Sequence, residues 1–256
     1  MTLELYHWEP TVNSAELLIC LHEKGIPFTS RYVDLLAFEQ HAPEFLALNP
    51  RGEIPVLVHD GHILTETTLV LEYLDAAFPG IPLVPEGAEE RYSVRVWTKC
   101  ANDYIAPALM LLGWHERMGE KRAAFDRASI EMRLARLPHD RRVVWQAALD
   151  DSYTPEQLAR AAQHLDVVVR RMEAALENSE WLAGPRYSLA DIAVYPAANA
   201  FQALRPDVIT STNLPKLADW LNRMRERPAV RAALELSRST RPEELFAPGP
   251  ELGRWG

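Results

Sequence analysis

Residues 49–57 read NPRGEIPVL and lead from a glycine-containing turn into an apolar strand. A proline at the first residue of a strand can adopt the cis peptide bond, which turns the backbone groups of the preceding residue outward. Ile54 would then offer its N–H and C=O to a peptide-like ligand, with Pro55 setting the geometry. An ordinary turn into an edge strand explains the same residues, so both interpretations stay open at this point.

The segments on either side of this stretch predict a small α/β domain. The apolar runs LELY and PFTSRYVDL flank a helical pattern that begins at Asn13, and another helix is expected over 65–77. Between VLVH and HILT, the pair Asp60-Gly61 supplies the positive φ angles of a tight hairpin turn. The expected order is strand, helix, strand, hairpin and helix, with 37–49 either helix or loop.

Residues 78–87, FPGIPLVPEG, mark a domain boundary. Three prolines and two glycines in ten positions are not tolerated by a helix interior or a central strand. The chain beyond has helical periodicity, and capping boxes that begin at Thr154 and Ser188 predict the starts of two helices. We expect an α/β domain over 1–78, a linker over 79–88 and an all-helical domain over 89–256.

Composition narrows the kinds of partner. The chain has 256 residues, of which 48% are hydrophobic, and its net charge of −9 opposes nucleic-acid binding and favours a small-molecule or protein partner. No run approaches the roughly 20 apolar residues that span a bilayer, and MTLELYHWEP lacks the features of a signal peptide. We therefore predict a cytoplasmic protein without membrane contact, with Cys20 and Cys100 as small core residues.

Several common catalytic motifs are missing from the sequence. The eight histidines show no H-E-x-x-H or H-x-x-x-H spacing, so no metal site is predicted. G-x-G-x-x-G and P-loop patterns are also absent, as is the G-x-S-x-G elbow of many serine hydrolases. Nucleotide binding and the simplest hydrolase mechanism therefore have no support.

The stretch TVNSAELL combines a helix start with a surplus hydroxyl. With Asn13 as the N-cap, Glu16 falls at the third helical position and completes a capping box. Helix formation does not require Ser14, whose hydroxyl would face beyond the helix end from the first helical position. Because a helix N-terminus carries roughly +0.5 of a charge, we expect an anion beside Ser14.

A third group of polar residues lies at the start of the helix expected over 65–77. Thr65 or Glu66 begins it, and Thr67 lies in its first turn, where a backbone N–H and a hydroxyl can hold a carboxylate. An acidic residue at this place can also hold an ammonium group. A site that accepts a carboxylate, an ammonium group, a peptide backbone and a thiolate describes glutathione.

In combination, these motifs resemble those of the cytosolic glutathione transferases. The resemblance rests on NPRGEIPVL, the pair Glu66-Thr67, the proline-rich linker and YSLADIAVYP at 187–196, which together cover both domains. It implies a thioredoxin-like N-terminal domain followed by an all-helical domain. It also implies a dimer, of identical or of different chains.

Within that superfamily the chain is most similar to the bacterial glutathione-dependent β-aryl etherases. The similarity is carried by MTLELY, Asn13-Ser14, FEQH at 38–41, VWTK at 96–99 and the long insertion before Thr154. It implies glutathione-dependent cleavage of lignin-derived aryl ethers next to a ketone, which releases a phenol and a glutathione thioether. A general detoxifying transferase and a non-catalytic carrier of aromatic ligands are the alternatives.

The resemblance also implies roles for individual residues. The implied glutathione contacts are Ser14 and Asn13 at the sulfur, Ile54 before Pro55 at the cysteinyl backbone, Glu66 and Thr67 at the γ-glutamyl end, and Gln40 and His41 near the glycyl end. Glutathione would be a co-substrate, and no metal or redox cofactor is needed. An apolar slot for the aromatic rings of the substrate is expected at Tyr104, Trp114 and Trp145.

Three further expectations concern single regions. Tyr6, at the end of the first expected strand, is an alternative activator of the thiol. The charge-rich segment 116–142 is either a solvated face or a cover over the active site. The residues from Ser237 onward are expected to run loosely over the surface.

Overall fold

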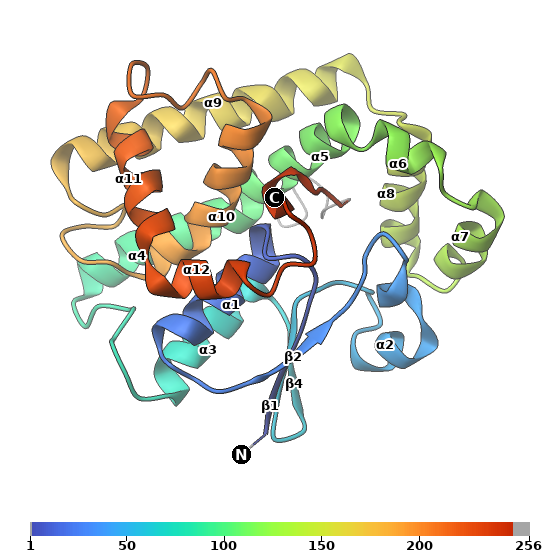
Figure 1. Cartoon of the computed structure of the whole chain (residues 1–256), viewed down its shortest axis with the longest axis horizontal. Helices are drawn as coiled ribbons and strands as arrows, with labels where there is room; N and C mark the ends of the chain where they lie inside the picture. The colour runs from blue at the N-terminus through green and yellow to red at the C-terminus, as the bar shows by residue number, and fades with distance from the viewer. Residues whose placement is uncertain (1, 248–256) are drawn as a thin grey trace.

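The computed structural model describes residues 2–247, and its N-terminal part is built on a four-stranded mixed sheet (Figure 1). The strand order is β2-β1-β3-β4, with β1 parallel to β2 and antiparallel to β3, and β3 antiparallel to β4. Asp60 and Gly61 both have positive φ angles and join β3 to β4, as predicted for a tight turn. The strands are β1 (Leu3–His7), β2 (Thr29–Tyr32), β3 (Val56–His59) and β4 (His62–Leu64).

Helices cover both faces of this sheet. On one face α1 (Val12–Glu23) packs on α3 (Thr67–Ala77), and their apolar side chains join the main core. On the other face a short helix, α2 (Pro43–Leu48), follows the 3₁₀ turn η1 (Glu39–His41), and its Phe45 packs in a second, smaller cluster with Val33 and Val56. Residues 37–49, for which the sequence allowed either helix or loop, therefore contain two short helical segments.

The C-terminal part is helical, and two of its helices begin at the predicted capping boxes. Thr154 and Gln157 exchange hydrogen bonds at the start of α9, and Ser188 and Asp191 do so at the start of α10. These caps satisfy backbone N–H groups that a helix leaves unpaired. The helices are α4 (Ala88–Cys100), the π-helical turn η2 (Ala101–Ile105), α5 (Ala106–Arg117), α9 (Pro155–Asn178), α10 (Leu189–Leu204), α11 (Pro215–Glu226) and α12 (Pro228–Leu234).

One continuous core joins the two parts. Helix α1 packs against both α10 and α12, so its buried face belongs to both domains. The proline-rich connection between α3 and α4 is tied to the N-terminal domain by Asp75, whose carboxylate accepts from the N–H groups of Leu83 and Val84. The same carboxylate pairs with the buried ammonium group of Lys24 at 2.9 Å. Cys20 and Cys100 are both buried, as predicted.

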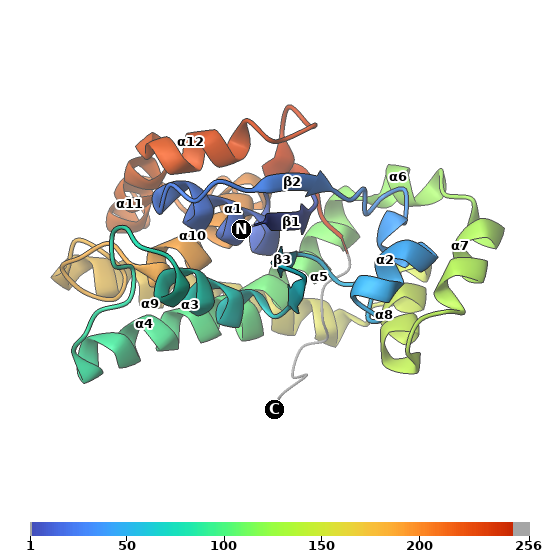
Figure 2. The same ribbon diagram turned by 90° about the horizontal axis from the view of Figure 1, so that it is seen from below.

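The charge-rich insertion forms three helices that stand beside α2, away from α3 and α4 (Figure 2). Arg133 connects them to the N-terminal domain, because its guanidinium donates to the carbonyl oxygens of Ala37 and Phe38 at 3.0 and 3.1 Å. The helices are α6 (Gly119–Ala123), α7 (Arg127–Leu134) and α8 (His139–Asp150).

The expectation of a loose C-terminal segment is wrong for the part that the structure describes. The Glu9 carboxylate accepts hydrogen bonds from the Ser237 hydroxyl and from the Arg238 and Ser239 N–H groups, which holds the start of the segment. Further along, the ring of Phe246 is buried against Gly113 of α5, where an added Cβ would lie 2.2 Å from the ring. The segment also contains the 3₁₀ turn η3 (Pro242–Glu244), and residues 248–256 of the prediction lie outside the described residues.

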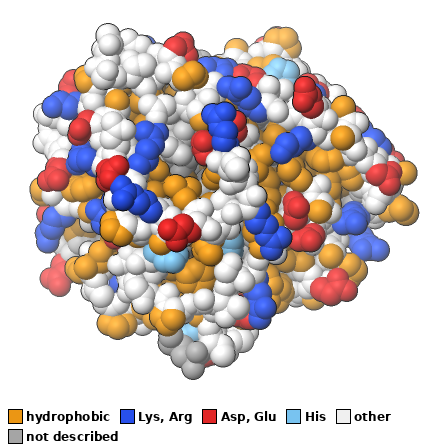
Figure 3. All heavy atoms as spheres, in the orientation of Figure 1, with side chains coloured by type: hydrophobic (Ala, Val, Ile, Leu, Met, Phe, Trp, Pro, Cys, Tyr) orange, Lys and Arg blue, Asp and Glu red, His pale blue; other side chains and the backbone are white. Residues whose placement is uncertain are grey.

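The surface is consistent with the composition. On the face drawn in Figure 3, basic and acidic side chains are interspersed, without a continuous basic patch of the kind that binds nucleic acid. No described helix has the length and apolar character needed to cross a membrane.

Candidate active site

A cavity of about 540 Å³ lies where the two domains meet. Its N-terminal side is formed by the loop before α1, the loop before β3 and the start of α3. Its other side is formed by α4, η2, α5, α8 and α9, with Ala247 from the C-terminal segment. A cavity of this size and position is typical of a small-molecule site.

Ser14 lines this cavity and its hydroxyl is held in place. The oxygen accepts a hydrogen bond from the N–H of Trp8 at 3.2 Å, and the side chain is only 4% exposed. A hydroxyl has one hydrogen to donate besides its acceptor positions, so this bond leaves the Ser14 hydrogen for another acceptor. An anion in the cavity beside Ser14 could receive it.

The predicted N-cap at Asn13 is wrong. Helix α1 begins at Val12, with Thr11 as the N-cap residue and no side-chain cap, so Ser14 is the third helical residue. In the loop before the helix, the Thr11 N–H donates to the Glu9 carbonyl at 2.7 Å, and the chain enters the helix two residues earlier than predicted. Asn13 lines the cavity instead, and its buried side-chain oxygen has no hydrogen-bond partner among the described residues.

Glu16 lies one turn along α1 and does not serve the predicted cap. Its side chain is buried, and burial raises the pKa of the carboxyl group well above its usual range, opposed in part by a hydrogen bond with Asn102. Burial thus favours the neutral acid. Burial therefore opposes a negative charge on Glu16, which would otherwise weaken the attraction of the helix end for an anion beside Ser14.

The loop before β3 forms a second part of the cavity wall. The Ile54-Pro55 peptide bond is cis, and both residues line the cavity. The side chain of Asn49 braces the loop, accepting from the Arg51 N–H at 3.1 Å and donating to the Glu53 carbonyl at 2.9 Å. The cis geometry that the sequence allowed is therefore present.

The start of α3 is the next part of the cavity wall. Thr67 is the first helical residue, two positions later than the earliest start considered, and Glu66 before it has a φ of 67°. Such a φ is uncommon for a residue with a side chain and is often found at functional sites. Thr65, Glu66 and Thr67 all line the cavity.

Gln40 and His41 are adjacent in the sequence but differ in position. Gln40 lines the cavity, and its buried side-chain oxygen has no partner among the described residues. His41 is fully buried behind the wall, against the Gly52 turn, and is not part of the lining. Burial, with the nearby Arg141 and Arg133, lowers the pKa of His41 to about 3, so its ring is neutral.

The three aromatic residues predicted to bind the substrate differ in their position relative to the cavity. Tyr104 and Trp145 line the cavity, on η2 and α8. Trp114 does not, because its side chain is fully buried, and its indole N–H donates to the Ala148 carbonyl at 2.8 Å. Tyr6, the alternative thiol activator, is not in the lining either and packs edge-on against Phe45 on the far face of the sheet.

Sequence reasoning missed Arg141 and Asn102, which both line the cavity. Asn102 lies in the π-helical turn, and its amide donates to the Thr68 hydroxyl at 2.9 Å. Arg141 lies four residues before Trp145 on α8, a spacing that places both on one helix face. That spacing was the available signal.

Family models decide the relationship of the chain to known proteins. The glutathione S-transferase N-terminal domain matches residues 13–77, and the glutathione S-transferase C-terminal domain matches residues 137–228. The chain belongs to the glutathione S-transferase family. Its sheet and its helical second domain are the thioredoxin-like and all-helical domains of that family, as predicted.

The individual proteins to which this glutathione S-transferase is similar include a β-etherase. Protein LigF from Sphingobium sp. strain SYK-6 is 35% identical, over 93% of this chain and 95% of LigF. The crystal structure of β-etherase LigF superposes with a TM-score of 0.86, at 34% identity over 93% of this chain and all of that one. Glutathione S-transferase TCHQD from Arabidopsis thaliana is 25% identical, over 91% of this chain and 89% of the relative. The predicted resemblance to the transferases, and within them to the β-etherases, is confirmed.

The site of this glutathione S-transferase can be compared with the needs of glutathione. Buried polar atoms of Asn13, Gln40 and Trp145 line the cavity without partners among the described residues, and they offer both donors and acceptors. Among residues 2–247, no group of three or more His, Cys, Asp or Glu side chains could hold a metal ion. The unpartnered donors and acceptors suit a polar ligand.

Proposed function

We propose that this glutathione transferase is a β-etherase. It would cleave the β-aryl ether bond of lignin-derived aryl ketones through displacement by the glutathione thiolate. The observation that carries the proposal is one cavity that joins Ser14 on the N-terminal side to Tyr104, Pro107 and Met110 on the helical side. The similarity to LigF, whose crystal structure is described as that of a β-etherase, supports this choice of reaction. We also expect the cytoplasmic dimer implied by the resemblance, which stays a prediction.

The first task of the site is to ionise the glutathione thiol. A free thiol with a pKa of about 8.5 is only a few per cent ionised at pH 7, and a decrease of two units requires roughly 2.7 kcal/mol. Charge-assisted hydrogen bonds contribute about 1.5–3 kcal/mol each, and a helix N-terminus adds about 0.3–1 kcal/mol. The Ser14 hydroxyl and the start of α1 can together supply this energy.

The second task is to hold the tripeptide. Ile54 would exchange backbone hydrogen bonds with the cysteinyl residue, a role that its position in the cavity lining supports. Glu66 and Thr67 would bind the ammonium and carboxylate groups of the γ-glutamyl end. Gln40 would lie at the glycyl end, with His41 supporting the wall from behind.

The proposed reaction requires the glutathione thiolate to lie beside the carbon that carries the aryloxy group. The sulfur lone pair forms a C–S bond at the carbon that carries the aryloxy group, and the C–O bond breaks with its electron pair on the phenolate oxygen. The proton lost by the thiol and the proton gained by the phenolate balance, so one thioether and one phenol form. The neighbouring ketone activates the carbon, and the enzyme contributes mainly position and ionisation.

The test is incubation with glutathione and a model β-aryloxy ketone, followed by quantification of the released phenol and the thioether. We expect equal amounts of both products, and none without glutathione. Activity on a generic aryl halide without phenol release would favour a general conjugating transferase. Ligand binding without turnover of either compound would favour the non-catalytic carrier.

A further inference from the structure

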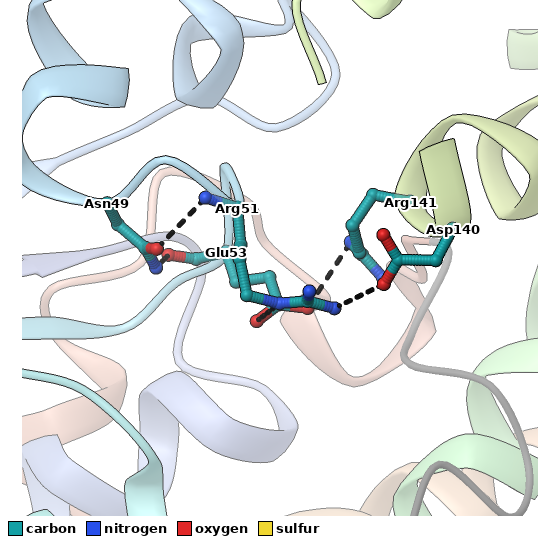
Figure 4. Close-up of polar contacts among 5 residues, drawn as sticks. All are labelled: Asn49, Arg51, Glu53, Asp140 and Arg141. Atoms are coloured by element: carbon teal, nitrogen blue, oxygen red, sulfur yellow. Dashed lines mark hydrogen bonds and ion pairs between the residues drawn. The ribbon is translucent and has the colours of Figure 1, made fainter. Parts of the chain in front are cut away.

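Two cavity-lining loops of the N-terminal domain are tied to other parts of the chain by charged side chains. In the loop before β3, Arg51 reaches Asp140 of α8 at 3.0 Å (Figure 4). The Nε of Arg141 on the same helix lies 3.2 Å from Glu53 of that loop. Arg141 is 4% exposed and lines the cavity, so this end of the charge-rich insertion covers the site and is no solvated face. The loop before α1 is tied to the C-terminal segment instead, through a single carboxylate.

That carboxylate belongs to Glu9 and is buried among hydrogen-bond donors. Glu9 is 2% exposed, which is rare for a glutamate without partners. The Tyr32 hydroxyl of β2 donates to it at 2.6 Å. The C-terminal segment adds the Ser237 hydroxyl and the N–H groups of Arg238 and Ser239. An ionised carboxylate can only accept, so these four donors match its chemistry.

The residue before Glu9 provides the hydrogen bond that holds Ser14. The Trp8 N–H donates to the Ser14 hydroxyl oxygen at 3.2 Å, and both residues line the cavity. This distance is at the long end of the range for N–H to oxygen bonds, so a small displacement of the donor would weaken the contact. Because Trp8 and Glu9 share a peptide bond, a shift of Glu9 would displace that donor.

His7 holds the same loop from the side of the sheet. Its Nδ1 contacts the Trp8 carbonyl oxygen, which can only accept, so the ring nitrogen donates. Its Nε2 lies 2.7 Å from the Ser30 hydroxyl of β2. Burial lowers the pKa of His7 and favours the neutral ring, in which Nε2 accepts the hydrogen of Ser30. The loop is thus held by His7 where it leaves β1 and by Glu9 where it meets the C-terminal segment.

We propose that Glu9 is a positioning residue for the reaction, which holds the Trp8 N–H on the Ser14 hydroxyl because its own carboxylate is fixed by β2 and the C-terminal segment. The Trp8 bond occupies an acceptor position of the Ser14 oxygen and leaves the hydroxyl hydrogen for the glutathione sulfur. Ser237, 228 residues from Glu9 in the sequence, would thereby affect thiol ionisation. This inference rests on the proposed function, in which Ser14 stabilises the thiolate.

The charge of Glu9 would by itself act in the opposite direction. A carboxylate disfavours a second negative charge nearby, so removal of its charge should lower the pKa of the glutathione thiol. Loss of positioning should raise that pKa, because the thiolate loses an oriented hydroxyl donor. A role in stability alone should leave the thiol pKa unchanged. The sign of the change therefore separates the three roles.

The test compares wild type with Glu9→Gln, and Glu44→Gln is the matched control. A glutamine side chain keeps the size of Glu9 but turns an amide NH₂ toward the donors that surround it. Glu44 is exposed on α2 and is not in the cavity lining. Thiolate absorbance across pH gives the thiol pKa in each glutathione complex. Hydrogen exchange of the Trp8 N–H, measured by NMR on the ligand-free protein, reports on positioning without any glutathione.

Glu9→Gln should raise the thiol pKa by about 0.5–1 unit and speed exchange of the Trp8 N–H by about 10-fold, whereas Glu44→Gln should change neither. An unchanged or lower thiol pKa in folded Glu9→Gln, or unchanged exchange at Trp8, would overturn the proposal. Faster exchange in Glu9→Gln, with a wild-type protein that does not lower the thiol pKa, would contradict the proposed thiol activation and leave the hold of Glu9 on the Trp8 N–H intact.

Two milder variants keep the proposal testable if Glu9→Gln fails to fold. Tyr32→Phe removes one donor to the carboxylate and keeps the ring, over which the Arg238 guanidinium lies 3.8 Å from the centre. Ser237→Ala removes one donor of the C-terminal segment. Each should raise the thiol pKa by less than Glu9→Gln. A thiol pKa that changes in neither variant would overturn the proposal, and a change in Tyr32→Phe alone would overturn the part assigned to the C-terminal segment.

Discussion

The two sides of the cavity are built in different ways. The N-terminal side takes most of its lining from three short motifs within 60 residues, each next to the start of a helix or strand, and adds Leu35 and Gln40. The helical side combines η2, α8, α9 and Ala247, which lie far apart in the sequence and meet only through packing. A local motif identifies its own residues, whereas a wall formed by tertiary contacts does not.

The largest expected effect lies on the N-terminal side. Ser14→Ala should lower turnover by about 10- to 100-fold at neutral pH, because the hydroxyl that stabilises the thiolate is lost. Asn13→Ala should have a smaller effect, since Asn13 neither caps α1 nor touches Ser14 in a described hydrogen bond. Steady-state rates with saturating glutathione check this order, and a larger loss in Asn13→Ala would make the amide the main sulfur contact.

The next effect tests the packing that forms the helical side. Gly113→Ala places a methyl group where the Phe246 ring lies, so we expect the free energy of unfolding to fall by about 1–3 kcal/mol. Gly119→Ala is the control, because the nearest atom to its added Cβ is 3.9 Å away, on Arg122. Urea denaturation compares the two, and equal stabilities would show that the C-terminal segment is not docked as described.

The capping box of α9 should contribute less to the free energy of unfolding than the contact between Gly113 and Phe246. Thr154→Ala removes one half of the capping box of α9, and we expect a loss of about 1 kcal/mol in the free energy of unfolding. The exposed Thr212→Ala serves as control and should change stability by less than about 0.5 kcal/mol. If both changes have the same effect, the sequence signal at Thr154 does not stabilise the helix.

A further effect on stability depends on pH and concerns His41. The folded ring has a pKa of about 3, so below about pH 6.5 the unfolded chain takes up a proton that the folded chain does not. His41 therefore makes stability fall as the pH decreases from about 6.5 toward 3, and it has no such effect above that range. His41→Leu should flatten this decrease relative to wild type, whereas the exposed His62→Gln should not, as measured by urea denaturation between pH 7 and 5.

The successes and errors of sequence reasoning follow the same division. The hairpin at Asp60-Gly61 and the capping box at Ser188 depend on a few adjacent residues, so they could be predicted. The cis bond before Pro55 was only one of two interpretations that the sequence left open. The start of α1 could not be predicted, because the preceding loop forms a hydrogen bond between Thr11 and Glu9. Capping rules favoured Asn13, whereas the turn between Glu9 and Thr11 precedes a helix that begins at Val12.

The aromatic residues show more clearly what cannot be predicted from the sequence. Trp114 and Trp145 have similar helical contexts in the sequence, yet one donates to a buried carbonyl and the other faces the cavity. The difference arises from how α5 and α8 pack, which periodicity does not reveal. The docked position of Phe246 likewise depends on the small size of Gly113, more than 130 residues earlier.

The central claim is that Ser14 at the start of α1 ionises the glutathione thiol. The most direct measurement is the pH dependence of thiolate absorbance in the glutathione complexes of wild type, Ser14→Ala and Tyr6→Phe. We predict that wild type lowers the thiol pKa by about two units from the free value near 8.5, that Ser14→Ala recovers at least about one unit, and that Tyr6→Phe leaves it unchanged. A thiol pKa that rises in Tyr6→Phe and stays low in Ser14→Ala would contradict the account.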